Sequence, residues 1–201
     1  MNTTPLCSPV ELSGRHARLV PLSREHEIGL QDACCDGDLW KLWYTRVPAP
    51  HEVAAEIERR LKLQDQAVML PFTVLDAQGR IVGMTTFMNI DNANRRVEIG
   101  STWYGASAQR TPLNTECKLM LLGHAFEQLA CIAVEFRTHR LNLQSRRAIE
   151  RLGAQLDGIL RSHIRGPDGT LRDTAVYSIT AAEWPVVKTH LQWQLEKPRE
   201  A

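Results

Sequence analysis

The feature that most constrains the fold is a run of three strand-like segments in the middle of the chain, with helical segments on both sides of it. "MLPFTVLDAQGRIVGMTTFMNI" (69–90) predicts two strands around an Ala-Gln-Gly turn. "RRVEIGSTWY" (95–104) follows after a short polar turn and is a third consecutive antiparallel candidate. A meander with helices before and after it predicts an α/β fold, in which a mixed sheet carries helices on its faces.

The segments around this meander give the order β-α-α-β-β-β-α-β-α-β-β-α. Ser23 is a good N-cap for the first helix, and Gly153 is expected to close another helix in the left-handed conformation. Thr180 is predicted as the N-cap of the last helix, with Pro185 in its first turn. The elements outside the meander are a strand at 16–22, helices at 23–34 and 50–66, a helix at 112–129, a strand at 132–139, a helix at 142–153, a hairpin of 154–165 with 171–179, and the helix after Thr180.

Length and composition are those of one globular unit. The 201 residues are 43% hydrophobic and 23% charged, which suits one α/β domain with a substantial core. We therefore expect a single domain over 1–201, with loose termini at 1–10 and 197–201. The apolar stretches are too short to span a bilayer, and residues 1–12 lack the basic start and apolar core of a signal peptide.

Cysteine and charge content limit the expected partners. The five cysteines form no Cys-x-x-Cys pair, so a disulfide framework is not expected and a cytoplasmic location is predicted. Cys34 and Cys35 are adjacent, but no histidine lies at metal-ligand spacing from them, so we expect no metal site. The net charge of +1 gives no general attraction to nucleic acid or to a membrane, and neither is expected as a partner.

Arginines are concentrated in the last third of the chain. Eight of them lie between Arg137 and Arg172, together with only three acidic residues. Charge alone leaves two interpretations equally open. The arginines can be solvated faces of helices and strands, or they can form a site for a polyanionic small molecule, because guanidinium groups suit phosphate oxygens.

The segment "AQRTPLNTECKLMLLGHAF" (108–126) begins as a loop and continues as a helix. Its start resembles a phosphate-cradling Gln-x-x-Gly-x-Gly loop in which Pro112 and Asn114 replace the two glycines. Thr111 and Pro112 are a good N-cap and N1 pair, and Asn is tolerant of left-handed backbone geometry. A helix N-terminus leaves backbone N–H groups unpaired and so attracts phosphate; here they are those of Leu113, Asn114 and Thr115. The alternative is a well-capped helix with no ligand.

The element order, this loop and "RTHRLNLQSRRAIERLGAQLDGILR" (137–161) together resemble the GNAT acetyltransferase superfamily. "LRDTAVYSI" followed by "EWP" favours the branch of ribosomal-protein N-terminal acetyltransferases, which is RimJ/RimL-like. The resemblance runs from about Glu11 to Trp184. It implies a mixed, mostly antiparallel sheet that splays between two central parallel strands, "VEIGSTWY" (97–104) and "IAVEFRTH" (132–139), with helices on both faces.

The resemblance also implies acetyl-CoA as the acyl donor. The pantetheine arm would lie between the splayed strands and pair with backbone groups near Trp103 and Tyr104, whose side chains are otherwise ordinary core aromatics. The CoA phosphates would be bound by the N-terminus of helix 112–129 and by the loop before it. That loop supplies Gln109, Arg110 and Thr111, of which Arg110 is the expected phosphate contact.

Two residues at the start of helix 142–153 are expected to contact the cofactor. Asn142 and Ser145 lie three apart and therefore project from one face of its first turn. By analogy with the family, Asn142 would hydrogen-bond the cofactor and Ser145 would protonate the departing thiolate. A thiol with a pKa near 8.5 leaves readily, so the acid need not be strong. Asn142 is also a common type of helix N-cap, and this second role stays open.

Glu98 is the candidate general base for the attacking amine. Strand alternation puts Val97 and Ile99 on one face and Glu98 on the other, just before the expected splay. A carboxylate with a raised pKa would accept the amine proton directly or through water. The alternative role of Glu98 is an ion pair with an arginine such as Arg95 or Arg137. Weaker candidates for proton handling are Glu135 and Tyr177.

The predicted function is transfer of an acetyl group from acetyl-CoA to a primary amine by direct attack. A cysteine nucleophile is disfavoured because neither Cys117 nor Cys131 has an evident histidine partner. The alternative, motivated by the missing glycines, is a CoA-binding or sensing protein without catalysis. The acceptor is either a protein N-terminus or a small amine. We expect helices 23–66 and the hairpin 154–179 to set its specificity, with Trp40, Trp43 and Tyr44 as pocket or core residues, and a homodimer is possible.

Overall fold

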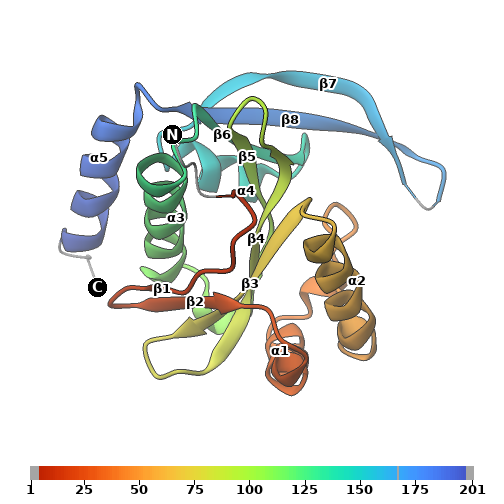
Figure 1. The fold of residues 1–201 in the computed structure, drawn as a ribbon. Coiled ribbons are helices and arrows are strands. Elements are labelled where there is room, and N and C mark those ends of the chain that lie inside the picture. Colours follow the sequence, from red (N-terminus) through yellow and green to blue (C-terminus); the bar gives the residue numbers. More distant parts are fainter. Residues whose placement is uncertain (1–4, 167, 198–201) are drawn as a thin grey trace.

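The computed structural model describes residues 5–166 and 168–197 as an eight-stranded sheet flanked by helices (Figure 1). Along the sheet the strands follow the order β1-β2-β3-β4-β5-β6-β8-β7. The strands are β1 (Leu12–Ser13), β2 (Ala17–Pro21), β3 (Met69–Asp76), β4 (Ile81–Asp91), β5 (Arg96–Tyr104), β6 (Ala133–His139), β7 (Gln155–Arg165) and β8 (Leu171–Thr180). The helices are α1 (Glu27–Cys35), α2 (Val53–Asp65), α3 (Leu113–Gly123), α4 (Leu143–Glu150) and α5 (Trp184–Glu196).

The centre of the sheet is a parallel pair of strands in an otherwise antiparallel arrangement. β5 and β6 pair through Arg96–Ala133, Val97–Val134 and Glu98–Glu135, and α3 makes the crossover between them. Within the described residues this pairing ends at Glu98, although β5 continues to Tyr104. The predicted splay between the two strands is therefore confirmed, and it begins at the candidate base.

Side chains of the two sheet faces form two separate cores. The larger cluster contains Val97, Ile99 and Tyr104 of β5 and lies under α3 and α5. The smaller contains Met84 and Trp103 and lies under α1 and α2, on the other side of the sheet (Figure 1). Because strand residues alternate between faces, Glu98 points away from Val97 and Ile99, toward the side of α1 and α2.

Helix α3 is joined to the sheet by two buried polar side chains as well as by apolar packing. The Glu116 carboxylate accepts hydrogen bonds from the backbone amides of Arg15, His16 and Ala17, which fixes the turn between β1 and β2. The Lys118 ammonium donates to Thr102 Oγ1 at 2.8 Å and to Thr85 Oγ1 at 3.2 Å. The apolar side of α3 and of the turn that follows it packs on the sheet, since Leu113, Cys117, Leu121, Ala125 and Leu129 are all buried.

Several predicted element ends were wrong by a few residues. The helix expected over 112–129 begins at Leu113, and residues 124–128 form a π-helical turn, in which Leu129 N donates to His124 O. Thr180 is not the N-cap of α5. That helix begins at Trp184 after Glu183, whose carboxylate instead accepts bonds from the Thr180 amide and hydroxyl. Pro185 does lie in the first turn, as predicted.

The turn after α4 agrees with the sequence prediction, whereas the start of the chain differs from it. Gly153 has a φ of +96° and so has the predicted left-handed conformation, three residues after the last residue of α4. The short strand β1 was not predicted. Of the termini expected to be loose, residues 1–4 and 198–201 lie outside the described part of the chain. Within 5–10, Leu6 is fully buried in the larger cluster.

Candidate active site

The site is built where the two parallel strands end. β5 leads into the N-terminus of α3 and β6 leads into the N-terminus of α4, so both helix starts lie at the carboxyl edge of the splayed pair. Gln109 connects the two loops: its Nε2 donates to Tyr104 O at 2.9 Å, and its Oε1 accepts from Gln144 Nε2 at 3.5 Å. Crevices outside the carboxyl ends of parallel strands are the usual ligand sites of α/β sheets.

The N-terminus of α3 has backbone amides that face no protein acceptor. Within the described residues the amides of Asn114 and Thr115 have no hydrogen-bond partner, while Leu113 N donates to Thr111 Oγ1 at 3.3 Å. Thr111 and Pro112 thus start the helix, although Pro112 is the N-cap residue and not the predicted N1. This end of α3 has the free donors and positive dipole end that a phosphate group needs.

In the loop before α3, the left-handed backbone conformation occurs at a different residue from the one expected. Asn114 lies in the first turn of the helix and does not use left-handed geometry. Arg110 does, with a φ of +60°, and its side chain is exposed at the mouth of the site. The Thr115 hydroxyl is already bonded, because it accepts from Arg151 Nη1 at 3.0 Å. A second arginine therefore lies beside the helix start.

Trp103 and Tyr104 contribute backbone to the site and side chains to the core. Both side chains are buried, and they lie in different clusters on opposite faces of the sheet. Trp103 Nε1 and Tyr104 Oη have no hydrogen-bond partner in the described structure, and burial raises the pKa of Tyr104 well above its usual value. The open interpretation of these aromatics as core residues is thus confirmed, while their contact with pantetheine stays a prediction.

At the start of α4, Asn142 is the N-cap. Its Oδ1 accepts a hydrogen bond from Ser145 N at 3.0 Å, which is one of the two roles expected for it. The Asn142 side-chain amide and the half-buried Ser145 hydroxyl have no hydrogen-bond partner within the described residues. Both groups are therefore available at the edge of the splay.

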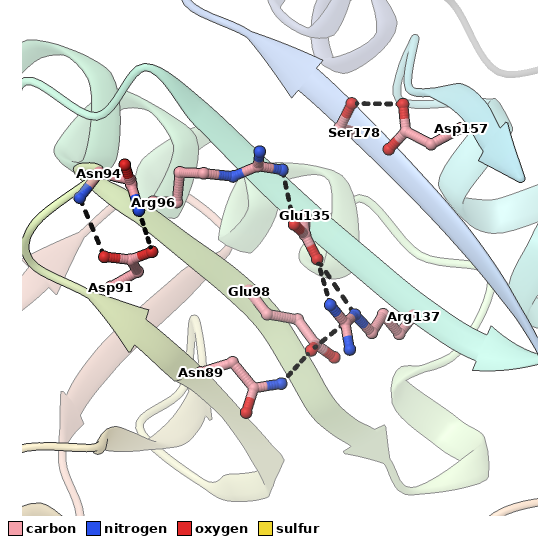
Figure 2. A network of polar contacts seen from close by, with 9 residues as sticks. All are labelled: Asn89, Asp91, Asn94, Arg96, Glu98, Glu135, Arg137, Asp157 and Ser178. Atoms are coloured by element: carbon pink, nitrogen blue, oxygen red, sulfur yellow. Dashed lines mark hydrogen bonds and ion pairs between the residues drawn. The ribbon is translucent and has the colours of Figure 1, made fainter. Parts of the chain in front are cut away.

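Glu98 lies at the point of splay and is held by neighbours on both sides (Figure 2). Its Oε2 accepts from Asn89 Nδ2 at 2.6 Å and lies 3.6 Å from Arg137 Nε. Burial raises the pKa of Glu98, against the lowering effects of the Asn89 hydrogen bond and the Arg137 charge. Only 5% of its surface is exposed, so Glu98 combines the predicted base position with the predicted alternative, an ion pair to Arg137.

The weaker candidates for proton handling are engaged in other contacts. Glu135 accepts from Arg96 Nη2 at 2.6 Å and from Arg137 Nη2 at 2.9 Å, so it is the centre of an arginine pair (Figure 2). The Tyr177 hydroxyl donates to Glu150 and accepts from Arg146 Nε, both on α4. Burial raises the pKa of the Tyr177 hydroxyl. These contacts make Glu98 the least neutralised carboxylate at the splay.

The buried cysteines are poor nucleophiles in this structure. Burial raises the pKa of Cys117 to about 12 and that of Cys131 to about 11. A nucleophilic thiolate requires the opposite shift. Within residues 5–166 and 168–197, no group of three His, Cys, Asp or Glu side chains is arranged to hold a metal ion. No helix in that part of the chain is long and apolar enough to cross a membrane.

We name the sheet surface that carries Glu98, Glu135, Arg137, His139 and Arg172 the acceptor face. It lies on the side of α1 and α2, and the loop after α1 reaches it, since the Trp43 ring contacts the His139 ring edge-on at 5.3 Å. Trp43 is 73% exposed and also contacts Tyr44, so it is a surface aromatic and not a core residue. The sheet surface beyond β6 is formed by the long β7–β8 hairpin (Figure 1).

Three residues of the site escaped the sequence analysis. Asn89 holds Glu98, Gln144 connects the two helix starts, and Arg172 lies on the acceptor face. Asn89 and Gln144 are common polar residues with no motif around them, so nothing in the sequence distinguishes them. Arg172 was only one of eight arginines. Most of the others are paired elsewhere, such as Arg140 and Arg161 with Asp173.

The sequence matches the acetyltransferase (GNAT) domain family over residues 16–155, which is well over half of the chain. The chain belongs to the GNAT acetyltransferase family. The expected family and fold are thus confirmed, and GNAT acetyltransferases are acyltransferases that use acetyl-CoA.

Individual GNAT relatives agree with this assignment. A GCN5-related N-acetyltransferase from Brucella melitensis is 32% identical, with a TM-score of 0.85 over 94% of this chain and 86% of that one. Mycobacterium smegmatis RimJ, solved in complex with CoA-disulfide, shares the fold with a TM-score of 0.80 at 21% identity, over 94% of this chain and 96% of that one.

A curated relative agrees with the predicted RimJ/RimL-like branch by its name. It is "Putative ribosomal N-acetyltransferase YdaF" of Bacillus subtilis (strain 168), which is 30% identical over 106 residues. The match spans 53% of this chain and 57% of that relative, so it reaches little more than half of either protein. What YdaF acts on therefore enters here only as support for a proposal.

Proposed function

We propose that this protein transfers an acetyl group from acetyl-CoA to a primary amine by direct attack of the amine on the thioester. The observation that carries the proposal is the position of Glu98, a buried carboxylate at the point where β5 and β6 splay, upstream of the helix starts that follow both strands. The raised pKa of Glu98 suits a base that must gain a proton from the substrate.

The residues at the carboxyl edge of the strands fit the acyl donor. The unpaired amides of Asn114 and Thr115 suit a pyrophosphate, and Arg110, exposed beside them, supplies positive charge. Beyond Glu98, the edge of β5 that faces β6 has no partner strand among the described residues. The backbone groups along this edge, up to Trp103 and Tyr104, suit the amides of a pantetheine arm. Gln109, Thr111 and Leu113 shape the loop, and Asn142 offers its side-chain amide from α4.

Proton transfers follow from the positions of Glu98 and Ser145. Glu98 accepts a proton from the acceptor amine, directly or through water, as the amine nitrogen bonds to the acetyl carbon. The carbon–sulfur bond breaks, and the Ser145 hydroxyl gives its proton to the CoA thiolate and regains one from solvent, while Glu98 releases to solvent the proton taken from the amine. Because a thiolate with a pKa near 8.5 is a good leaving group, a weak acid such as Ser145 is sufficient.

The acceptor class is proposed to be an amine with access from solvent. The exposed Trp43 beside the acceptor face suits contact with a flexible chain end, and the name of YdaF supports a protein N-terminus. A small amine is the second candidate. An α-amine has a pKa near 8 and is partly neutral at pH 7, whereas a lysine side chain is almost wholly protonated. Glu98 therefore suits the α-amine better.

The decisive experiment combines calorimetric titration of acetyl-CoA with a thiol-release assay over peptides and small amines. Binding together with thiol release supports the transferase. Binding without release across the whole panel favours the alternative, a CoA-binding protein without catalysis, and no binding at millimolar acetyl-CoA rejects both. A Cys117→Ala variant that keeps full turnover supports direct attack, whereas a trapped acetyl group on Cys117 would contradict it.

A further inference from the structure

Arg172 differs from the other charged residues of the acceptor face because it has no bonded partner in the described part of the chain. Its guanidinium forms no hydrogen bond and no ion pair there, and its Nε atom is buried without an acceptor. Arg172 itself is half-buried on β8, two residues before Thr174, which is paired with His139. It therefore lies on the same face as Arg137 and His139, just beyond the end of β6.

The carboxylates nearby do not neutralise Arg172. Glu135 is occupied by Arg96 and Arg137, and Glu98 contacts Asn89 and Arg137. Asp173 is adjacent in sequence but lies on the opposite face, where it pairs with Arg161 at 3.1 Å and Arg140 at 3.6 Å. Among the described residues Arg172 is thus a cation with an enclosed donor and no acceptor, which is costly unless a ligand supplies one.

Arg172 and the proposed base, Glu98, interact through their charges. Burial raises the pKa of Glu98 and the Arg172 cation opposes that rise, while burial lowers the pKa of Arg172 and the Glu98 charge opposes that fall. Burial and the Arg172 charge also lower the pKa of His139, which favours a neutral imidazole beside the Trp43 ring. The acceptor face therefore presents an anion at Glu98 and a cation at Arg172, with neutral aromatic groups beside them.

We propose that Arg172 binds an anionic group of the acceptor, so that the preferred acceptor is a primary amine carrying a carboxylate a few bonds away. Such a molecule would place its amine at Glu98 and its anion at Arg172, where a guanidinium can form paired hydrogen bonds to both anionic oxygens. The inference rests on the transferase function proposed above. It narrows the acceptor to two sources: an acidic protein N-terminus or a free amino acid.

The test compares acceptors with and without the anion, and each rate is referred to the concentration of neutral amine, because the amine of glycine has a higher pKa than that of glycinamide. One arm uses peptides that begin with Asp or Asn and are otherwise identical, and the other uses glycine and glycinamide. Acetylation is measured with the wild-type protein, Arg172→Gln, Arg172→Lys, and Arg161→Gln as a control, because Arg161 is exposed and pairs on the other face. Preference in the peptide arm alone identifies a protein N-terminus, and preference in the glycine arm alone identifies a free amino acid.

We expect the wild-type protein to favour the anionic member of at least one pair by roughly tenfold or more in kcat/KM, as is usual for a hydrogen bond to a charged group. In Arg172→Gln the preference for the anionic member over the neutral member is lost through KM. Arg172→Lys restores part of it, and Arg161→Gln leaves it intact. Equal rates for both members in the wild-type protein, or a preference that survives Arg172→Gln, would overturn the inference while leaving the transferase function standing.

Failure of the proposed function gives a different result. In that case no acceptor is acetylated, and calorimetric titration of the same peptides and amino acids decides the role of Arg172. Binding of the anionic member that is lost in Arg172→Gln keeps the anion site and rejects the transferase. Absence of any difference in binding between the members rejects both.

Discussion

The two halves of the site, the cofactor side and the acceptor face, present different kinds of chemical group. On the cofactor side, the groups proposed to bind acetyl-CoA are mostly backbone: the amides at the start of α3 and the edge of β5 beyond Glu98. On the acceptor face, the groups are charged side chains of β5, β6 and β8, held by Asn89 and by one another. Backbone groups survive substitutions that keep the helix start in place, whereas each charged side chain depends on its own identity.

This difference explains how the α3 loop can lack glycine. The loop needs one left-handed residue, and Arg110 takes that conformation while Pro112 sets the first turn of the helix. The free amides that face a phosphate are unaffected by the side chains beside them. On the acceptor face, by contrast, replacement of one charged group changes the charge balance at the reacting atoms.

Glu98→Gln is the strongest test of this difference between the cofactor side and the acceptor face. We expect kcat/KM to fall by about 10²–10⁴, the usual contribution of a positioned general base, with acetyl-CoA affinity unchanged because the cofactor side is intact. Steady-state kinetics and calorimetry measure the two effects. In the wild-type protein the rate should fall as pH is lowered through the raised pKa of Glu98. If Glu98→Gln weakens acetyl-CoA binding while the rate is retained, the cofactor side and the acceptor face do not act through separate groups.

Glu98→Gln also has an expected effect on stability. The folded-state pKa of Glu98 is raised, so its contribution to stability is present below the unfolded pKa and is lost as pH rises through the folded pKa. Above that folded pKa the wild-type protein has lost it, whereas the neutral glutamine side chain of the variant carries no buried charge at any pH. We therefore expect the Tm difference between variant and wild type to be more positive at pH 7 than at pH 4. Thermal unfolding at the two pH values measures this.

Lys118→Met tests how a buried lysine beneath the cofactor side affects the stability of the fold. Burial lowers the pKa of Lys118 from 10.5 to about 8, a difference that corresponds to roughly 3 kcal/mol of instability when the lysine is charged. Stability should rise with pH between the folded and unfolded pKa values, because the unfolded chain binds more protons there. In Lys118→Met this slope disappears and stability at pH 7 increases. Denaturant unfolding between pH 7 and 10.5 measures the pH slope and the stability at pH 7. A slope that remains in Lys118→Met would contradict a lowered pKa of Lys118 as its cause.

Asn142 separates a capping role from a cofactor role. Asn142→Ala removes the acceptor for Ser145 N and should cost about 1 kcal/mol of stability. Asn142→Asp keeps the cap but replaces the amide donor with an anion, so only acetyl-CoA affinity should fall. Chemical denaturation and calorimetry distinguish the two variants. Unchanged acetyl-CoA affinity in Asn142→Asp would show that Asn142 is a cap and nothing more.

Arg110 separates charge from backbone strain in the loop. Arg110→Gly and Arg110→Ala both remove the phosphate contact and should weaken acetyl-CoA to the same extent. The glycine variant alone relieves the left-handed strain, which amounts to about 1 kcal/mol, so it should be the more stable of the two. Equal stability of the two variants would show that the strain is absent.

The smallest effect is expected for Pro112→Gly. If the helix end itself binds the phosphate, the affinity for acetyl-CoA should be unchanged or slightly higher, because the free amides of Asn114 and Thr115 remain. Calorimetry on a variant with a native circular dichroism spectrum measures this. Loss of binding in the folded variant would mean that the rigid turn, and not the helix end, makes the site.

The sequence by itself determined the order of the elements, apart from the short strand β1, and the face of β5 that carries Glu98. These are local properties, since hydrophobic period, turn residues and N-cap types are read within a few residues. Its errors were local as well: the left-handed residue is Arg110 and not Asn114, and α5 begins after Glu183 and not after Thr180.

Only the tertiary structure decided which polar groups meet. Asn89, Glu98, Arg137 and Arg172 come from four different strands, and their contacts depend on the sheet order and register. Whether an arginine is paired or free depends on neighbours far away in sequence, so eight arginines that look alike in the chain become different. Charge interactions act through space and not along the chain, and that is why the acceptor face could not be read from the sequence.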